Sequence, residues 1–173
     1  EIVSELYGVV REAAGDAVVI ACNAVSHLSA GIFELYRTGD DTSGRLWSRT
    51  RAYGVNTLAF RLCQNDAFYK VDADCVGTIP GKIDWSLNRQ WLDILSVSGS
   101  PLFISVKPDD ITDSMKEDIK KAFFRNSGQK DKAEPLDWLY NNQPQVWLIN
   151  GEKREYDFVE NSYPELLSGS TQS

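Results

Sequence analysis

The sequence predicts an α/β fold: about four βα units, half of a (β/α)8 barrel, followed by a short β tail. Three observations support this prediction. Strand-length apolar runs alternate with helical patterns, which is typical of a parallel sheet with helical crossovers. Polar and charged residues collect where the apolar runs end, as they do at the carboxyl ends of barrel strands. Finally, the chain has 173 residues, whereas a complete barrel needs about 250.

The first expected element is a helix that ends at Gly15, because apolar residues recur at helical spacing before it (Ile2, Leu6, Val9, Val10 and Ala13). No capping residue precedes this helix, so we expect further residues upstream in a longer protein. Residues 16–23 and 30–41 are short apolar runs that indicate buried strands. Residues 43–54 are expected to form a helix that ends at Gly54.

The middle of the chain continues the alternation. Residues 56–62 are expected to be a further strand or the edge of a helix, and residues 67–75 a third strand that ends in acids. A helix is predicted over 85–99, ended by Gly99, before a fourth buried strand at 101–106. The apolar face of that helix comprises Leu87, Trp91, Ile94 and Leu95.

The last expected helix begins with a capping box made by Ser114 and Glu117. Its apolar face comprises Met115, Ile119, Ala122 and Phe123. These elements place a partial barrel in residues 1–130. Residues 131–165 are expected to start a β-domain or to form a β-hairpin tail, with Asn150-Gly151 as the hairpin turn, and residues 166–173 to be a disordered end.

Composition excludes several classes of partner. The net charge is −7 without a Lys/Arg-rich block, which argues against nucleic acid. The longest apolar stretches are far shorter than the roughly 20 residues of a membrane span, so we expect no membrane segment. Three widely spaced cysteines without a CxxC pair predict neither a disulfide framework nor a zinc ribbon, and His27 adds no metal-ligand spacing. We therefore expect no metal, and the compartment stays unknown.

Charge gathers in YRTGDDTSG, residues 36–44, at the end of a predicted strand. A carboxylate there can act as a general acid when its neighbours tune its pKa, and Arg37 precedes Asp41 by one helical-turn spacing of four residues. Asp41 would then be the proton donor, with Asp40 as the competing choice. The alternative is a solvated turn in which one acid caps the next helix.

A second acidic pair follows the third predicted strand. Asp72 and Asp74 stand two residues apart, and residues at that spacing in a strand point to the same face. They are either paired acids or polar loop residues.

Three segments resemble a known family: IACNAVSHLSAGIFELYRTGDDTSG, AFYKVDADCVG and NRQWLDILSVSGSPLFIS. The first resembles a stretch of the retaining α-galactosidase clan, glycoside hydrolase families 27 and 36, in which a strand-end Cys precedes a strand ending in Arg-x-x-x-Asp. The second is similar to that clan's Asp-Pro-Asp-Cys or Asp-Pro-Asp-Met segment. The third is similar to the helix and final barrel strand after it. In family order, the segments cover about residues 1–125, which implies the C-terminal half of the barrel.

The resemblance implies a role for each matching residue. Asp41 would be the general acid/base. The residues that would contact the sugar or line its pocket are Arg37, Cys22, Asn23, Asp74 and Cys75. Two departures leave the sugar open: Ala73 replaces the usual proline, and Asn23 stands where many members have glutamate or glycine.

The implied activity is cleavage of α-linked galactosides or related hexosides by double displacement, without a cofactor. Such an enzyme needs two carboxyl groups about 5–5.5 Å apart, and the clan's nucleophile comes from a Lys-x-Asp strand upstream of the matched region. Nothing before Asp16 can supply it, and Lys107-Pro108-Asp109 follows the last predicted strand. We therefore expect this chain alone to be inactive and to associate with the missing N-terminal half or with a second copy. A periplasmic or secreted setting is implied by the resemblance only.

Another class of function stays open. The chain could be a non-catalytic α/β module, related to these hydrolases, that binds a carbohydrate or a partner with the same loops. Tryptophans could stack on sugar rings, but Trp91 lies on an apolar helix face and is expected in the core. Trp138 and Trp147 are expected to pack the tail sheet.

Overall fold

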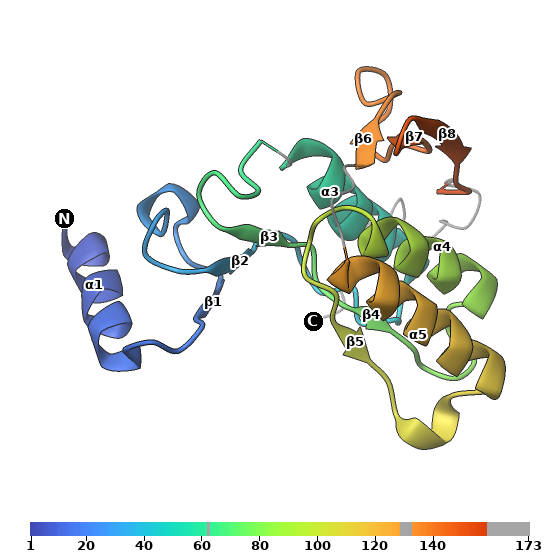
Figure 1. The fold of residues 1–173 in the computed structure, drawn as a ribbon, viewed down its shortest axis with the longest axis horizontal. Coiled ribbons are helices and arrows are strands. Elements are labelled where there is room, and N and C mark those ends of the chain that lie inside the picture. Colours follow the sequence, from blue (N-terminus) through green and yellow to red (C-terminus); the bar gives the residue numbers. More distant parts are fainter. Residues whose placement is uncertain (62, 129–132, 159–173) are drawn as a thin grey trace, which may run out of the picture.

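The structure is a computed structural model, which describes residues 1–61, 63–128 and 133–158. Parallel strands β1 (Ile20–Cys22), β2 (Leu35–Arg37) and β3 (Lys70–Asp72) form a sheet in that order. The chain then turns into β4 (Val76–Gly77), which pairs in parallel with β5 (Ile104–Ser105). Strands β1, β2, β3 and β5 thus lie within the four predicted strand segments, although each is shorter than predicted, whereas β4 lies just after the predicted segment 67–75 and was not predicted (Figure 1).

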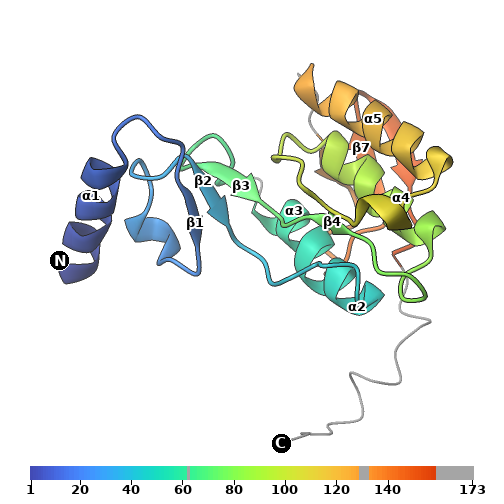
Figure 2. The ribbon, with the colours of Figure 1, turned by 90° about the horizontal axis from the view of Figure 1, so that it is seen from below.

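Helix α1 (Ile2–Ala14) ends at Gly15 as predicted, where φ is 55°. Its apolar face is uncovered, with Ile2 81% and Val9 62% exposed. Two of its residues contact the rest of the chain: Tyr7 packs against Phe33, with ring centroids 5.3 Å apart, and Arg11 forms an ion pair with Glu34 at 2.7 Å. Figures 1 and 2 both show α1 beyond β1, at the end of the molecule opposite the α4 and α5 helices described below. The outer edge of β1 is unpaired within the described residues.

One helical segment runs from residue 47 to residue 60. It comprises α2 (Trp47–Arg49), the π-helical η2 (Thr50–Val55) and α3 (Asn56–Phe60). The predicted end at Gly54 was therefore wrong. Of the two alternatives for residues 56–62, the edge of a helix is confirmed by α3 and the strand was wrong within the described residues. A Cβ at Gly54 would lie 2.9 Å from the Trp91 ring, so glycine here permits a close helix crossing instead of ending the helix.

Helices α4 (Trp85–Ser96) and α5 (Asp113–Ser127) lie side by side (Figure 2). Helix α4 ends three residues before the predicted Gly99. The predicted cap of α5 was wrong: the Thr112 hydroxyl accepts from the Met115 amide at 3.3 Å, whereas Ser114 lies inside the helix. Phe123 is 44% exposed and does not belong to the buried face. Short 3-10 turns η1 (Ser26–Leu28) and η3 (Pro108–Asp110) follow β1 and β5, so Lys107-Pro108-Asp109 lies in a loop.

The tail is an antiparallel sheet of β6 (Ala133–Pro135), β7 (Val146–Ile149) and β8 (Glu152–Glu155). Asn150 and Gly151 have φ values of 54° and 82°, so the predicted hairpin turn is confirmed and has positive φ at both central residues. The boundary near residue 130 stays a prediction. The predictions for residues 159–165 and 166–173 fall outside the described residues.

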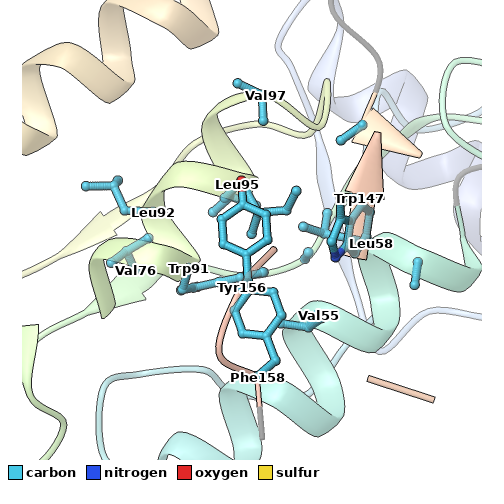
Figure 3. Packing of buried hydrophobic residues seen from close by; sticks show 14 of the residues in the cluster. Val55, Leu58, Val76, Trp91, Leu92, Leu95, Val97, Trp147, Tyr156 and Phe158 are labelled. Carbon is cyan, nitrogen blue, oxygen red and sulfur yellow. The ribbon is translucent and has the colours of Figure 1, made fainter. Parts of the chain in front are cut away.

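The tail sheet and the helices share one hydrophobic core, seen in Figure 3. Trp147 of β7 and Trp91 of α4 are both fully buried in it, so Trp91 is a core residue as predicted. Tyr156 and Phe158 stack beside them, with ring centroids 5.2 Å apart. Trp138, by contrast, is 46% exposed. The core therefore fixes β4, α4 and the helical segment 47–60 relative to one another.

Candidate functional site

The register of the first sheet brings three strand ends together. Cys22, Arg37 and Asp72 are direct neighbours at the last positions of β1, β2 and β3. Because the strands are parallel, the loops that follow them leave from the same edge of the sheet. This edge is where the predicted site residues were expected to meet.

Arg37 lies at the centre of this edge and contacts both acidic loops. Its Nη2 is 2.9 Å from Oδ1 of Asp41, and its Nη1 is 3.7 Å from Oδ1 of Asp74. Burial of the guanidinium lowers the pKa of Arg37, but the nearby Asp74, Cys22 and Asp41 outweigh it and raise the pKa, so Arg37 stays charged. The structure thus brings Arg37, Asp41 and Asp74 together.

The two adjacent acids differ in their surroundings. Asp40 accepts a hydrogen bond from the Asp41 amide at 2.7 Å and forms an ion pair with Arg49. The Asp41 amide and the Arg49 guanidinium lower the pKa of Asp40, which disfavours it as a proton donor. The side chain of Asp41 is the more exposed, at 59% against 44% for Asp40. Both acids are paired with an arginine, and Asp41 is the one more accessible to a ligand.

Neither acid caps a helix. Leu46 occupies the N-cap position of α2 and makes no side-chain capping bond. The alternative of a capping role was therefore wrong, although Asp40 does turn its carboxylate onto the backbone of the next residue.

Asp72 and Asp74 do not share a strand face, so that expectation was wrong. β3 ends at Asp72, and Asp74 has a φ of 72°, outside the extended region. The Asp74 amide donates to Oδ1 of Asp72 at 2.8 Å, which closes a local turn. The two carboxylates therefore have different contacts. Asp72 is buried and stabilises the turn, whereas the Asp74 side chain extends from the turn toward Thr42.

Asp74 is bound to the loop that contains Asp41. Its Oδ2 accepts from the Thr42 amide at 2.6 Å and from the Thr42 hydroxyl at 3.2 Å. The same hydroxyl is 2.6 Å from the carbonyl of Cys75, to which the Trp91 indole N–H also donates at 3.2 Å. Thr42 is only 2% exposed. The loop is thereby tied to the third strand segment and, through Trp91, to the core.

Two glycines let the same loop approach that segment closely. A Cβ on Gly44 would lie 2.2 Å from the carbonyl oxygen of Gly77, and a Cβ on Gly77 would lie 2.3 Å from the carbonyl carbon of Ser43. No side chain other than hydrogen fits between these backbones. The loop is therefore held by packing as well as by hydrogen bonds.

The remaining predicted residues are less closely engaged. Cys22 is exposed at the end of β1, and Asn23 is exposed with a φ of 55°. Within the described residues, no hydrogen bond or ion pair joins Asn23 to Arg37, Asp41 or Asp74. Burial, together with the Asp74 carboxylate, raises the pKa of the Cys75 thiol to about 11, so this thiol is neutral at physiological pH.

A hollow of about 350 Å³ adjoins Asp41. This volume lies at the lower end of the range for small-ligand sites. Its lining comprises Asp41, Thr42, Ser43, Arg45, Leu46 and Arg49. A larger hollow, of about 1090 Å³, lies between α4, α5 and β8 and contains none of the predicted site residues. Of these two hollows, the smaller one places a candidate acid next to open space.

Several general properties can be stated for the described residues. All three cysteines are free, and no group of three or more His, Cys, Asp or Glu side chains could hold a metal ion. None of the described helices is both long and apolar enough to cross a membrane.

No family model matches the chain, and no curated protein matches it.

The sequence did not identify Thr42, Arg49 or Gly44 as parts of the site. Thr42 and Gly44 stand inside the quoted stretch YRTGDDTSG, but their roles depend on contacts with residues more than thirty positions away. The only local signal was the density of small residues after the two acids.

Replacing Asp72 by asparagine is expected to stabilise the protein at about pH 7 and to have little effect near pH 4. Burial raises the pKa of Asp72 above its ordinary 3.8, so the folded protein keeps this proton to higher pH than the unfolded chain does. Its favourable contribution is complete below the unfolded pKa and is lost as the pH rises through the folded pKa. Asparagine has no charge to desolvate, and its Oδ1 can still accept from Asp74. Urea unfolding across this pH range would test the prediction, and a pH-independent difference between the two proteins would contradict it.

Proposed function

We propose that this chain is the acid/base half of a retaining glycoside hydrolase of the α-galactosidase type, within the C-terminal half of its barrel. The observation that best supports the proposal is the contact of Arg37 with both Asp41 and Asp74 at one edge of a parallel sheet. These residues come from two of the three segments in which the sequence resembles the clan, and they are adjacent in space.

In the proposed reaction, Asp41 protonates the glycosidic oxygen as the bond to the leaving group breaks. A carboxylate from a preceding strand attacks the anomeric carbon and forms a glycosyl ester. Asp41, now ionised, accepts a proton from water, which attacks the same carbon and releases the sugar and the carboxylate. Arg37 holds Asp41 in place and compensates its negative charge in the second half of the reaction.

The free edge of β1 is where the missing half of the barrel would add. β1 is the outermost strand of its sheet in the described residues, and Ile20 on it is 47% exposed. The neighbouring Val18 is 66% exposed. A parallel strand paired with β1 would satisfy its backbone and cover these side chains. The same strand would bring the nucleophile to the edge occupied by Arg37.

A non-catalytic binding module is the second candidate. The observation in its favour is that the charged groups at the 350 Å³ hollow are paired: Asp41 in its lining pairs with Arg37, and Arg49 in its lining pairs with Asp40. Such a pocket offers hydrogen-bonding groups to a sugar without any free carboxylate.

Hydrolysis of methyl α-galactoside by the full-length protein tests the proposal. The wild type should hydrolyse it, and Asp41→Asn should lose roughly 100-fold or more, the usual contribution of a general acid. Asp40→Asn is the matched comparison and should lose less than about 10-fold, because Asp40 serves to hold Arg49. Binding of galactose without hydrolysis by the wild type would instead favour the binding module.

A further inference from the structure

We propose that Asp74 is a positioning residue, which holds the loop of Asp41 in place and does not bind the sugar. This inference rests on the proposed function and changes the role that the resemblance gave to Asp74.

The contacts of the Asp74 carboxylate are directed at the loop. Oδ2 accepts from the Thr42 amide at 2.6 Å and lies 3.2 Å from the Thr42 hydroxyl, whose single proton it shares with the closer Cys75 carbonyl. Oδ1 faces Arg37 at 3.7 Å. The side chain is only 14% exposed. Because the side chain is mostly buried, a sugar hydroxyl has little access to these oxygens. The carboxylate is therefore directed mainly at groups of the protein.

The backbone of Asp74 fixes the direction of this carboxylate. With φ at 72°, the residue adopts a left-handed conformation that non-glycine residues rarely take, and its amide is bound by Asp72. Asp72 is itself buried at the end of β3. The turn thus aims Asp74 from the third strand toward the neighbouring loop.

Two routes lead from Asp74 to the proposed acid. Thr42 follows Asp41 directly in the chain, so the hydrogen bonds to Thr42 fix the backbone beside Asp41. Arg37 contacts both carboxylates, so Asp74 also helps to hold the group that orients Asp41. Beyond Thr42, the contact between Gly44 and Gly77 fixes the far end of the loop. Loss of Asp74 should therefore displace Asp41 while the rest of the loop stays packed.

A displaced acid has a kinetic signature. Protonation matters most when the leaving group is a poor one, such as methoxide, and matters least for p-nitrophenolate, which departs without a proton. Hydrolysis of the glycosyl ester is the same for both substrates, so the contrast appears in kcat/KM, which reports the steps up to departure of the leaving group. A positioning residue should therefore affect kcat/KM for the methyl glycoside more than for the p-nitrophenyl glycoside. A residue that binds the sugar should instead raise KM similarly for both substrates.

The experiment compares Asp74→Gly, Thr42→Val and Thr42→Ser in the full-length protein with methyl and p-nitrophenyl α-galactosides. Glycine removes both carboxylate oxygens and tolerates the positive φ of position 74, whereas asparagine would keep an acceptor for the Thr42 amide. Asp74→Gly should lower kcat/KM at least about 10-fold more for the methyl glycoside, without a rise in KM. Thr42→Val should show the same pattern more weakly. Thr42→Ser, which keeps the hydroxyl, should behave like the wild type on both substrates. Asp66→Asn is the control, because Asp66 pairs with Lys70 at the opposite end of β3.

Equal losses on the two substrates with raised KM, or no loss in Asp74→Gly, would overturn the inference and leave the proposed function standing. Hydrogen exchange at the Thr42 amide provides a readout that needs no activity, and it should be at least about 10-fold faster in Asp74→Gly. If the wild type hydrolyses neither glycoside, the proposed function fails. Faster exchange would then still support the holding role of Asp74, and unchanged exchange would overturn that as well.

Discussion

Replacing Gly44 by alanine is expected to lower the free energy of unfolding by roughly 3–5 kcal/mol. Two costs add. The φ of Gly44 is +79°, where a side chain is strained, and the new Cβ would lie 2.2 Å from the carbonyl oxygen of Gly77. Backbone atoms form the obstacle, so rotation of a side chain cannot relieve it. Urea unfolding of the intact protein, followed by tryptophan fluorescence, would measure the loss.

Gly81→Ala is the matched control for this substitution. Gly81 has nearly the same φ, +74°, but no atom lies within 4 Å of the position of its Cβ. Its replacement should cost only the strain, about 1 kcal/mol. If Gly44→Ala costs no more than Gly81→Ala, the close approach of the loop to Gly77 is not present in solution. A large loss in Gly44→Ala should also reduce hydrolysis, because the loop contains Asp41.

The sequence predicted those elements whose signals are local. Helical spacing before Gly15 located α1, and Asn150-Gly151 located the tail hairpin. The strand segments were found, but their lengths were overestimated. Asn23 and Asp74 have positive φ and end the extended backbone, although both follow apolar runs. Hydrophobicity alone does not report the point at which a strand stops.

The errors arose where packing outweighed local preference. Gly54 has a poor intrinsic helix propensity, yet its lack of a side chain allows contact with Trp91, and the helical segment continues through it. At the start of α5, Thr112 and Ser114 are both good capping residues, and the position of the first helical turn decided in favour of Thr112. Sequence spacing alone could not separate these choices.

The candidate site was predictable in its residue types but not in its connections. Arg37 and Asp41 stand four residues apart, so their proximity could be expected from the sequence. The bonds between Thr42 and Asp74 join positions 32 residues apart and depend on the pairing of β2 with β3. Because that pairing was not known beforehand, Asp74 could be given a role only through the resemblance.

Replacing Trp91 by alanine is expected to cost about 3–5 kcal/mol, the usual range for a large aromatic core residue. Its side chain is fully buried, it packs on Gly54, and its indole N–H donates to the Cys75 carbonyl. Trp138→Ala provides the control: Trp138 is 46% exposed, so its loss should cost much less, and equal losses would contradict the assignment of Trp91 to the core.

Trp91→Phe separates the two contributions of this side chain, since it keeps an aromatic ring but removes the N–H donor. The stability loss should be smaller, about 1–3 kcal/mol. The Cys75 carbonyl also accepts from Thr42, so it keeps one partner. If hydrolysis by the full-length Trp91→Phe protein falls more than its stability loss explains, the Cys75 carbonyl connects the core to the loop of Asp41. If activity is unchanged, Thr42 and Asp74 hold that loop without help from the core.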